Sequence, residues 1–488
     1  METVSLVMEV LRRFDERGVA YCHWKSNDHL AAAISADTDL DILVDPAAID
    51  DVYAVFAQLS CRRGRVANAR NDIGLEDFLG IDDESARMVH FHVHYRIPAG
   101  ERHNKRFRLP WERTVLESRV LDPSGVWVTA PAVEVVLLLT RYALKLRGRD
   151  MIRGSSGPGS ELKFLMARAD RADVLKISEQ LLGERGRRAV EACLDQSPGT
   201  AQLYRLRRVV LRALASQTSS RGPAAFSRRM NREAAWAMRG ISRKFVPRPV
   251  LKGRGGTGGG LIVAFVGCDG SGKSTMVGET RAFLAPKLDV FPMYLGSGDG
   301  SSSLLRKPMK MVRDLVFGTS RDRSTIAKKA KVGEEHPSAM SGAKALWALT
   351  LAAEKSRKLR QIMKARTRGM VVICDRWPQM QFPGELDGPR LTHWSTGNAM
   401  QRWLAAYELR PYDLARRFPP DIVIRLDVDV ETAAQRRPED GREYLAHRIE
   451  LVRALTFDGS LFGAVEIDGT EPPEKVLTEI RRAIWSRL

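Results

Sequence analysis

The segment from Gly267 to Thr275 constrains the fold of this chain more than any other stretch of its sequence. It fits the pattern G-x-x-x-x-G-K-[ST] at every fixed position, and the apolar run Leu261 to Val266 directly precedes it. Such a run is typical of a strand buried on both faces of a parallel sheet. The stretch from Ser274 to Leu284 is compatible with a helix. Strand, glycine-rich turn and helix form the context that this phosphate-binding motif requires.

The small residues of this loop explain its chemistry. They let backbone N–H groups converge on phosphate oxygens, and the N-terminus of the following helix adds partial positive charge. We expect Lys273 to reach the β- and γ-phosphates of ATP and the Ser274 hydroxyl to ligate Mg²⁺. A chance match near the glycine-rich stretch Gly255 to Gly260 is the alternative, which the flanking strand and helix disfavour. The predicted cofactor-binding residues are Gly267, Asp269, Gly270, Ser271, Gly272, Lys273, Ser274 and Thr275.

The composition indicates a soluble protein with several folded cores. Its 488 residues suffice for two or three domains, and its hydrophobic (44%) and charged (28%) contents are ordinary. The five cysteines include no C-x-x-C pair, which favours a reducing cytoplasmic environment over a disulfide framework or zinc ribbon. Met1 to Gly18 indicates an amphipathic helix rather than a signal peptide. The nearest approach to a membrane span, Val126 to Leu139, is short and contains Glu134.

The segment from Gly253 to Gly260 has the composition of a linker and suggests the main domain boundary. Downstream, strand-like and helix-like stretches alternate, which predicts a doubly wound parallel sheet covered on both faces. Upstream, strands and helices mix before a mostly helical stretch. We expect an α+β domain at 1–125, a helical domain at 126–218, a basic helix and linker at 219–260, and an α/β P-loop NTPase domain at 261–488. The strands expected in the last domain are Leu261 to Val266, Val290 to Leu295, Met370 to Cys374, Asp421 to Leu426 and Ala464 to Ile467.

Much of the net charge of +19 lies in one region. Between residues 221 and 254 there are ten lysines and arginines and one acidic residue, Glu233. Phe226 to Val246 interleaves these basic residues with apolar ones, which suits either a membrane surface or packing against a domain, and we favour packing. No nucleic-acid-binding motif accompanies the charge, so no specific nucleic-acid partner is predicted. The expected partners are a nucleotide and a small-molecule acceptor, and a homodimer is left open.

Two further elements complete a catalytic pattern around the loop. Asp375 and Arg376 end the strand-like run that begins at Val371, at the edge where ligands bind in open α/β sheets. Asp375 could hold the hydration shell of Mg²⁺, and Arg376 could contact the transferring phosphate. Arg436 to Arg442 is a charged connection between helices, and its arginines, with Arg437 and Arg442 as catalytic candidates, suit a lid over phosphates. A solvated helix connection is the alternative for this segment.

The C-terminal segment, about residues 261 to 488, resembles thymidylate kinases. The resemblance rests on the loop itself with Phe265, on Asp375-Arg376-Trp377, on Pro420 to Arg436, and on Ile467-Asp468-Gly469-Thr470 followed by Val476 and Ile480. It implies that Lys273, Ser274 and Arg376 handle phosphates and that Asp269 lies near the acceptor. It also implies that the arginines from Arg436 to Arg442 form the lid.

The segments that would hold the acceptor depart from this family. Tyr294 to Ser303 replaces a T-R-E-P-G-type segment, and Trp377 to Gly384 replaces residues that contact the base. We therefore expect an ATP-dependent phosphotransferase whose acceptor is a nucleotide, a sugar or a sugar phosphate, with dTMP still open. The serines and glycines of the first segment could bind a sugar or form a surface loop. The alternative functions are an ATP-gated regulatory or binding protein without turnover, and nucleotidyl transfer in the N-terminal half.

The N-terminal half carries a pair of carboxylates, Asp39 and Asp41, that point to one face of a strand. Such pairs hold divalent metal ions for phosphoryl chemistry. With His23 to Asn27 before and Val89 to Arg96 after, residues 15 to 100 resemble a minimal nucleotidyltransferase-type domain. His92 occupies the position where that resemblance implies a third carboxylate, which leaves catalysis by this half open. The three alternating histidines of the segment Val89 to Arg96 are His90, His92 and His94. They could ligate a metal with Asp39 and Asp41 or line a polar cleft, and we favour the cleft.

Overall fold

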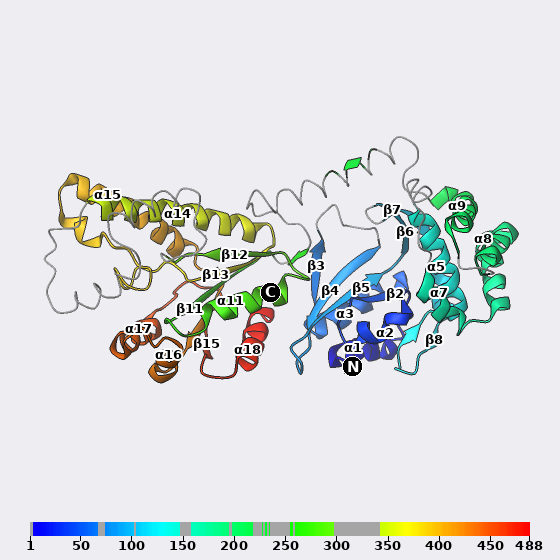
Figure 1. Cartoon of the computed structure of the whole chain (residues 1–488), viewed down its shortest axis with the longest axis horizontal. Coiled ribbons are helices and arrows are strands. Elements are labelled where there is room, and N and C mark those ends of the chain that lie inside the picture. Colours follow the sequence, from blue (N-terminus) through cyan, green and yellow to red (C-terminus); the bar gives the residue numbers. More distant parts are fainter. Residues whose placement is uncertain are drawn as a thin grey trace. The chain divides into compact units, whose positions relative to one another are not determined.

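The computed structural model describes residues 3–66, 74–101, 104–146, 158–194, 198–217, 254–256, 259–296 and 342–488, with a few isolated positions between 227 and 234. The chain forms two compact units (Figure 1). The first comprises Met1–Gly259 with Lys287–Asp289 and Leu488, and the second comprises Gly260–Pro286 with Val290–Arg487. In the part of the chain described here, no helix combines the length and apolar character that crossing a membrane needs.

The second unit is built on a parallel sheet. Its strands are β11 (Leu261–Gly267), β12 (Val290–Tyr294), β13 (Val371–Asp375), β14 (Ile422–Asp427) and β15 (Ala464–Asp468), in the order β12-β13-β11-β14-β15. All neighbouring pairs run parallel. Each of the five strands expected from the sequence is confirmed to within a residue at either end. The fully buried β11 lies at the centre, between two strands that follow it in the chain.

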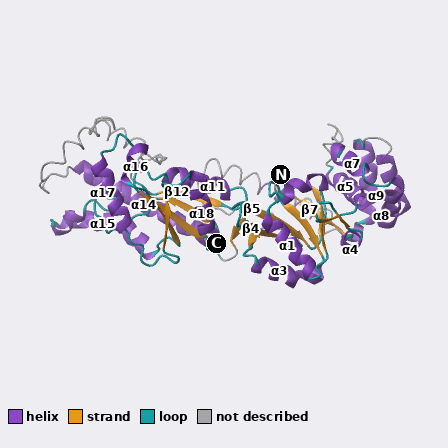
Figure 2. Cartoon of the chain, turned by 90° about the horizontal axis from the view of Figure 1, so that it is seen from below, coloured by secondary structure: helices purple, strands orange, loops and turns teal. Residues whose placement is uncertain are grey.

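Helices cover both faces of this sheet. They are α11 (Lys273–Leu284), α14 (Gly342–Thr367), α15 (Ala399–Arg417), α16 (Val430–Arg436), α17 (Arg442–Ala454) and α18 (Pro473–Trp485), with the short 3₁₀ turn η4 (Thr392–Thr396). Figure 1 shows α14 on one side of the sheet and α11 and α18 on the other, and Figure 2 shows the strands between helices. This mixed α/β architecture is consistent with the expected P-loop NTPase fold.

Helix α15 was not expected from the sequence. Pro411 lies inside it, and a proline interrupts the pattern that predicts a helix. A capping box starts this helix, because the Asn398 side chain accepts from the Gln401 N–H and the Gln401 side chain accepts from the Asn398 N–H. Buried Pro411 and Tyr412 anchor its second half. Packing against α14 therefore outweighs the local cost of the proline.

The first unit is built on a mixed sheet. Its strands are β1 (Tyr21–His23), β2 (Leu40–Val44), β3 (Arg62–Val66), β4 (Leu75–Ile81), β5 (Met88–His94), β8 (Val120–Leu121), β9 (Trp127–Val128) and β10 (Arg254–Gly256). The order is β10-β3-β4-β5-β2-β1-β9-β8, with β2 parallel to β5 and β1 parallel to β9. A separate hairpin joins β6 (Ile97–Glu101) and β7 (Asn104–Leu109).

Helices complete this unit as two packed groups. The first group is α1 (Ser5–Glu16), η1 (Asn27–His29), α2 (Leu30–Ile34), η2 (Pro46–Ala48) and α3 (Ile49–Gln58). The second group is α5 (Pro131–Lys145), α7 (Gly159–Met166), α8 (Arg171–Leu194), α9 (Thr200–Ala213) and η3 (Ala215–Gln217), and Val115 and Leu116 of α4 (Glu112–Glu117) lie in the same core. The largely buried α5 packs against the other three helices of its group and against β6. The expected amphipathic N-terminal helix is confirmed, and the described residues between 131 and 217 are mostly helical, as expected.

One segment differs from its expected state. Arg254–Gly256, expected within a linker, forms the edge strand β10 and pairs antiparallel with β3. Edge pairing uses backbone groups alone, so a glycine-rich segment can join a sheet although its composition indicates a linker. The basic segment 221–254 lies almost wholly outside the described residues, and so does its expected helix.

Candidate functional site

The loop between β11 and α11 lies at the carboxyl end of the central strand. Here the chain order of the strands reverses, because β13 lies on one side of β11 and β14 on the other. Gly270 and Gly272 both have φ of +85°, a conformation that other residues adopt at a cost. A Cβ on Gly270 would also lie 3.0 Å from the carbonyl oxygen of Ala433. These glycines let the loop turn tightly into the first turn of α11, which begins at Lys273.

The Lys273 ammonium folds back onto the loop. Its Nζ donates to the Ser271 hydroxyl at 3.3 Å and to the Cys268 carbonyl oxygen. Only 7% of the residue is exposed. Burial lowers the pKa of Lys273 to about 8, and the nearby charge of Arg376 acts in the same direction. The loop thus holds the Lys273 ammonium. This group could donate to a phosphate oxygen instead of to the backbone carbonyl oxygen.

Ser274 and Asp375 meet although a hundred residues separate them in the chain. The Ser274 Oγ donates to Asp375 Oδ2 at 3.4 Å. Asp375 Oδ1 is buried and has no hydrogen-bond partner among the described residues. Burial raises the pKa of Asp375, against the opposing charges of Arg376 and Lys273. A buried carboxylate oxygen without a partner, beside a hydroxyl, is a donor set that suits Mg²⁺, which prefers oxygen ligands.

Arg376 lies directly after β13 in a left-handed backbone conformation, with φ of +70°. This conformation costs a non-glycine residue on the order of 1 kcal/mol. Its N–H donates to the Phe265 carbonyl oxygen at 3.0 Å. Its guanidinium donates to Asp269 at 3.2 Å and to Asp387 at 3.0 Å. The structure therefore brings Arg376 and Asp269 together beside the loop.

The arginines of the connection between α16 and α17 differ in their contacts. Arg436 donates to the Gly270 carbonyl oxygen at 3.3 Å, so it contacts the phosphate-binding loop. Arg437 pairs with Glu439 at 2.9 Å, and Arg442 pairs with Glu431 at 2.7 Å. Each of these two pairs is more than half exposed and uses a local partner. The catalytic roles of Arg437 and Arg442 remain predictions.

Two residues beside the loop were not found from the sequence. Asp387 fixes Arg376 from a loop without regular structure. Arg448, in α17, lies with 9% of its side chain exposed, pairs with Glu385 at 2.9 Å and lies 3.9 Å from Asp269. An arginine on a predicted helix gives no signal of burial in its sequence neighbourhood. Buried guanidinium groups pair with carboxylates, and here this pairing becomes visible only in the folded structure.

The segments that depart from thymidylate kinases differ in how much of them is described. Of Tyr294 to Ser303, the residues after Gly296 lie outside the described part of the chain. Trp377 and Gln379 are buried. The Gln379 amide donates to the carbonyl oxygens of Phe382 and Glu385 and accepts from the Phe382 N–H. Gln379 therefore holds the shape of its own loop.

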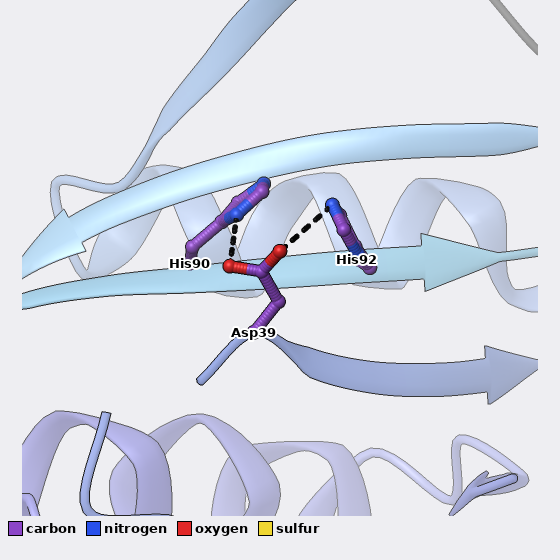
Figure 3. Close-up of side chains that lie close together, drawn as sticks. All are labelled: Asp39, His90 and His92. Carbon is purple, nitrogen blue, oxygen red and sulfur yellow. Dashed lines mark hydrogen bonds and ion pairs between the residues drawn. The ribbon is translucent and has the colours of Figure 1, made fainter. Parts of the chain in front are cut away.

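A second polar cluster lies on the sheet of the first unit. Adjacent strands place Asp41 beside His92 and His92 beside Asp77, in the order β2, β5, β4. Asp39 precedes β2, and Figure 3 shows its carboxylate between the rings of His90 and His92. The sequence predicted Asp39, Asp41 and the histidines but not Asp77. Each histidine of β5 contacts a carboxylate: His90 contacts Asp39 and Asp77, and His92 and His94 contact Asp41.

Burial and charge set the pKa values in this cluster in opposite directions. Burial lowers the pKa of His92, but hydrogen bonds to Asp41 and Asp77 outweigh it and raise this pKa to about 9. Burial lowers the pKa of His94 to about 4. Burial raises the pKa of Asp41, but the Lys25 ammonium at 2.8 Å and His92 outweigh it and hold it well below its usual range. The cluster is thus a tightly coupled set of carboxylates, histidines and cations.

Comparisons with known proteins bear on these sites. No protein-family model matches the chain. Over 229 residues it is 31% identical to the uncharacterized ATP-binding protein YghS of Escherichia coli (strain K12), covering 46% of this chain and 93% of that protein. It is 28% identical over 230 residues to YghR of the same strain, covering 46% and 86%. It is 26% identical over 243 residues to a thymidylate kinase of Lactobacillus helveticus (strain DPC 4571), covering 47% and 97%.

The fold and the loop define a class of protein. A parallel sheet with a G-x-x-x-x-G-K-S loop at its central strand is consistent with a P-loop NTPase of the kinase-like kind. The chain belongs to the family of the ATP-binding protein YghS, of which it covers nearly the full length. More than half of the chain lies outside each alignment, and the nucleotidyltransferase-like character of the N-terminal half remains a prediction.

Proposed function

We propose that this chain is an ATP-dependent phosphotransferase that acts through its second unit. The observation that carries the proposal is the meeting of Lys273, Ser274, Asp375 and Arg376 at the carboxyl end of the central strand. Support comes from relatives that are named ATP-binding proteins and from a more distant one named thymidylate kinase.

The side chains of this site divide the work of phosphoryl transfer. Lys273 and the first N–H groups of α11 bind phosphate oxygens and balance their charge. Ser274 and Asp375 would hold Mg²⁺, which supplies charge neutralisation on the triphosphate. Arg376, oriented by Asp387 and Asp269, faces the transferring group. Arg437 and Arg442 would join when the loop that carries them closes.

The acceptor in this proposal is a nucleotide, a sugar or a sugar phosphate. The residues that replace the acceptor motifs of thymidylate kinases support a changed acceptor. Gln379, which follows the Asp375-Arg376-Trp377 motif, donates its amide N–H groups to backbone carbonyl oxygens of its own loop. A substrate other than dTMP alone is therefore part of the proposal, and the cytoplasm is its proposed location.

The test is ATP-dependent transfer by the purified full-length chain to a panel of nucleoside monophosphates, sugars and sugar phosphates. Lys273→Ala should lower turnover on the order of a hundredfold or more, because it removes a charge aligned with the transferring group. Lys475→Ala is the matched control, since Lys475 is exposed and pairs with Glu471. Circular dichroism should show both variants folded.

Two outcomes would contradict the proposal. If the wild-type chain binds ATP tightly but transfers phosphate to no member of the panel, the regulatory alternative gains. If Asp41→Asn abolishes activity and Lys273→Ala retains it, the chemistry belongs to the nucleotidyltransferase-like half.

A further inference from the structure

Asp39, His90 and His92 present three ligand atoms to one point of the first unit. One ligand atom from each lies within 4.8 Å of the other two. The distance from His90 Nδ1 to Asp39 Oδ1 is 2.8 Å, and that from His92 Nε2 to Asp39 Oδ2 is 3.6 Å. Figure 3 shows both rings directed toward the carboxylate. The rings themselves are close, with centroids 4.2 Å apart.

Carboxylates behind the two histidines fix which nitrogen of each ring is available. Asp77 lies 2.7 Å from His90 Nε2 and is 3% exposed, so it accepts the Nε2–H. Asp41 lies 3.3 Å from His92 Nδ1 and accepts the Nδ1–H. The remaining nitrogens, His90 Nδ1 and His92 Nε2, face Asp39, and His92 Nε2 also lies 3.0 Å from Asp77 Oδ1. A carboxylate that orients a histidine in this way is the usual partner of a metal-ligating imidazole.

The contacts of these nitrogens independently point to a cation between them. With Nε2–H directed at Asp77, His90 Nδ1 and Asp39 Oδ1 are two acceptors at 2.8 Å, and the Lys287 ammonium donates to the same Asp39 oxygen. Arg254 places its guanidinium 3.2 Å from His92 Nε2, and a guanidinium can only donate. In this structure Arg254 thus takes the role of a cation at His92.

We propose that Asp39, His90 and His92 bind one divalent transition-metal ion of the Zn²⁺ type. Metal–ligand bonds of about 2.0–2.2 Å in tetrahedral geometry separate ligand atoms by about 3.3 Å. The observed separations of 2.8 Å and 3.6 Å lie on either side of this value. Two imidazoles and one carboxylate leave further coordination positions for water or a ligand. Asp77 and Asp41 act as positioning residues.

The ligand types favour a transition metal over Mg²⁺. Imidazole nitrogen suits Zn²⁺ and its neighbours, whereas Mg²⁺ takes oxygen ligands. The site therefore differs from a magnesium site at Asp39 and Asp41, and it does not depend on the proposed function of the second unit.

A neighbouring group of three, Asp41, His92 and His94, is the weaker candidate. A lysine pairs with the carboxylate of each group, Lys25 with Asp41 at 2.8 Å and Lys287 with Asp39, but His94 is almost fully buried. The side chain of Asp39 is 32% exposed and that of His92 is 18% exposed, which gives an ion a route to the first group. His92 belongs to both groups, so one ion bound at the first group would use it.

The experiment titrates the chelator-treated full-length chain with Zn²⁺ by calorimetry, against a competing chelator, and with Co²⁺ by visible absorption. We expect one ion per chain and a Co²⁺ spectrum that shows nitrogen ligation. Asp39→Asn and His92→Gln should each weaken Zn²⁺ binding at least about tenfold. This is the smallest loss expected even for a residue that only hydrogen-bonds to a metal ligand, and these two residues are ligands themselves. His29→Gln is the matched control, because His29 is an exposed histidine of the same unit.

Thermal unfolding separates a metal site from a purely structural cluster. Saturating Zn²⁺ should raise the Tm of the wild type and of His29→Gln but not that of Asp39→Asn. The proposal is overturned if the wild type binds no ion stoichiometrically, if both site variants bind Zn²⁺ as the wild type does, or if Mg²⁺ competes equally. Loss of stability in the variants without any Zn²⁺-dependent shift in the wild type would also overturn it, in favour of a structural ion-pair network.

Discussion

Deprotonation of Lys273 should weaken ATP binding within an accessible range of pH. Burial lowers the pKa of this lysine from 10.5 to about 8 in the ligand-free chain. A bound triphosphate favours the charged form, so ATP must bind together with a proton wherever Lys273 is neutral. This lowering of the pKa by about 2.5 corresponds to about 3 kcal/mol. That is the cost of burying the charged ammonium, and contacts with phosphate offset it.

The expected pH dependence of the Kd for ATP follows from the lowered pKa of Lys273. Below about pH 7.5 Lys273 is charged, and the Kd for ATP should not depend on its titration. From pH 8 to 10 the Kd should rise about tenfold per unit, or roughly a hundredfold in all. Asp269, Asp375 and Arg376 also face the ammonium. Burial raises the pKa of Cys268 above its ordinary value of 9.0, so the thiol titrates after Lys273.

The measurement is calorimetric titration with a non-hydrolysable ATP analogue at constant ionic strength and constant free Mg²⁺. Lys273→Met should bind the analogue about a hundredfold more weakly at pH 7 and show no slope between pH 8 and 10. Lys475→Met, on an exposed position, should keep the wild-type profile. A flat wild-type profile up to pH 10, or an unchanged slope in Lys273→Met, would refute the reasoning about this lysine.

Two further predictions concern ion pairs of the second unit. Asp421 is 5% exposed and accepts from Arg366 at 2.6 and 2.8 Å, so Asp421→Asn should lower the free energy of unfolding by about 2–3 kcal/mol. Glu466→Gln, at a 69% exposed partner of Arg425, should cost less than about 1 kcal/mol in the same urea titrations, and equal losses would contradict the argument from burial. Arg442→Ala should lower kcat at least about tenfold if the lid closes, with less than about 1 kcal/mol lost in unfolding, because its pair is exposed. An unchanged kcat in single-turnover assays would remove Arg442 from the lid.

The sheet of the second unit could be predicted because each of its strands is a short apolar run next to a polar turn. The β11 strand and its loop form a local pattern, and local patterns survive in the sequence. The partner of Arg376 could not be predicted in this way. Asp387 lies in an irregular loop, eleven residues along the chain, and its place beside the arginine depends on how that loop packs. The same holds for the buried Arg448, whose helix shows no sequence signal for a charged residue in the core.

The cluster of the first unit shows why a correct motif can lead to an incomplete site. Asp39, Asp41 and His92 were predicted because they fall at fixed spacings on two strands that the sequence indicates. Asp77 lies on β4, which pairs antiparallel with β5, and no spacing from Asp41 predicts which residue of β4 will stand opposite His92. Register decides this, and register depends on the burial of neighbours such as Phe78 and Phe91, which pair in the same ladder. The carboxylate missing from β5 is therefore present one strand further along the sheet, where it orients histidines instead of replacing them.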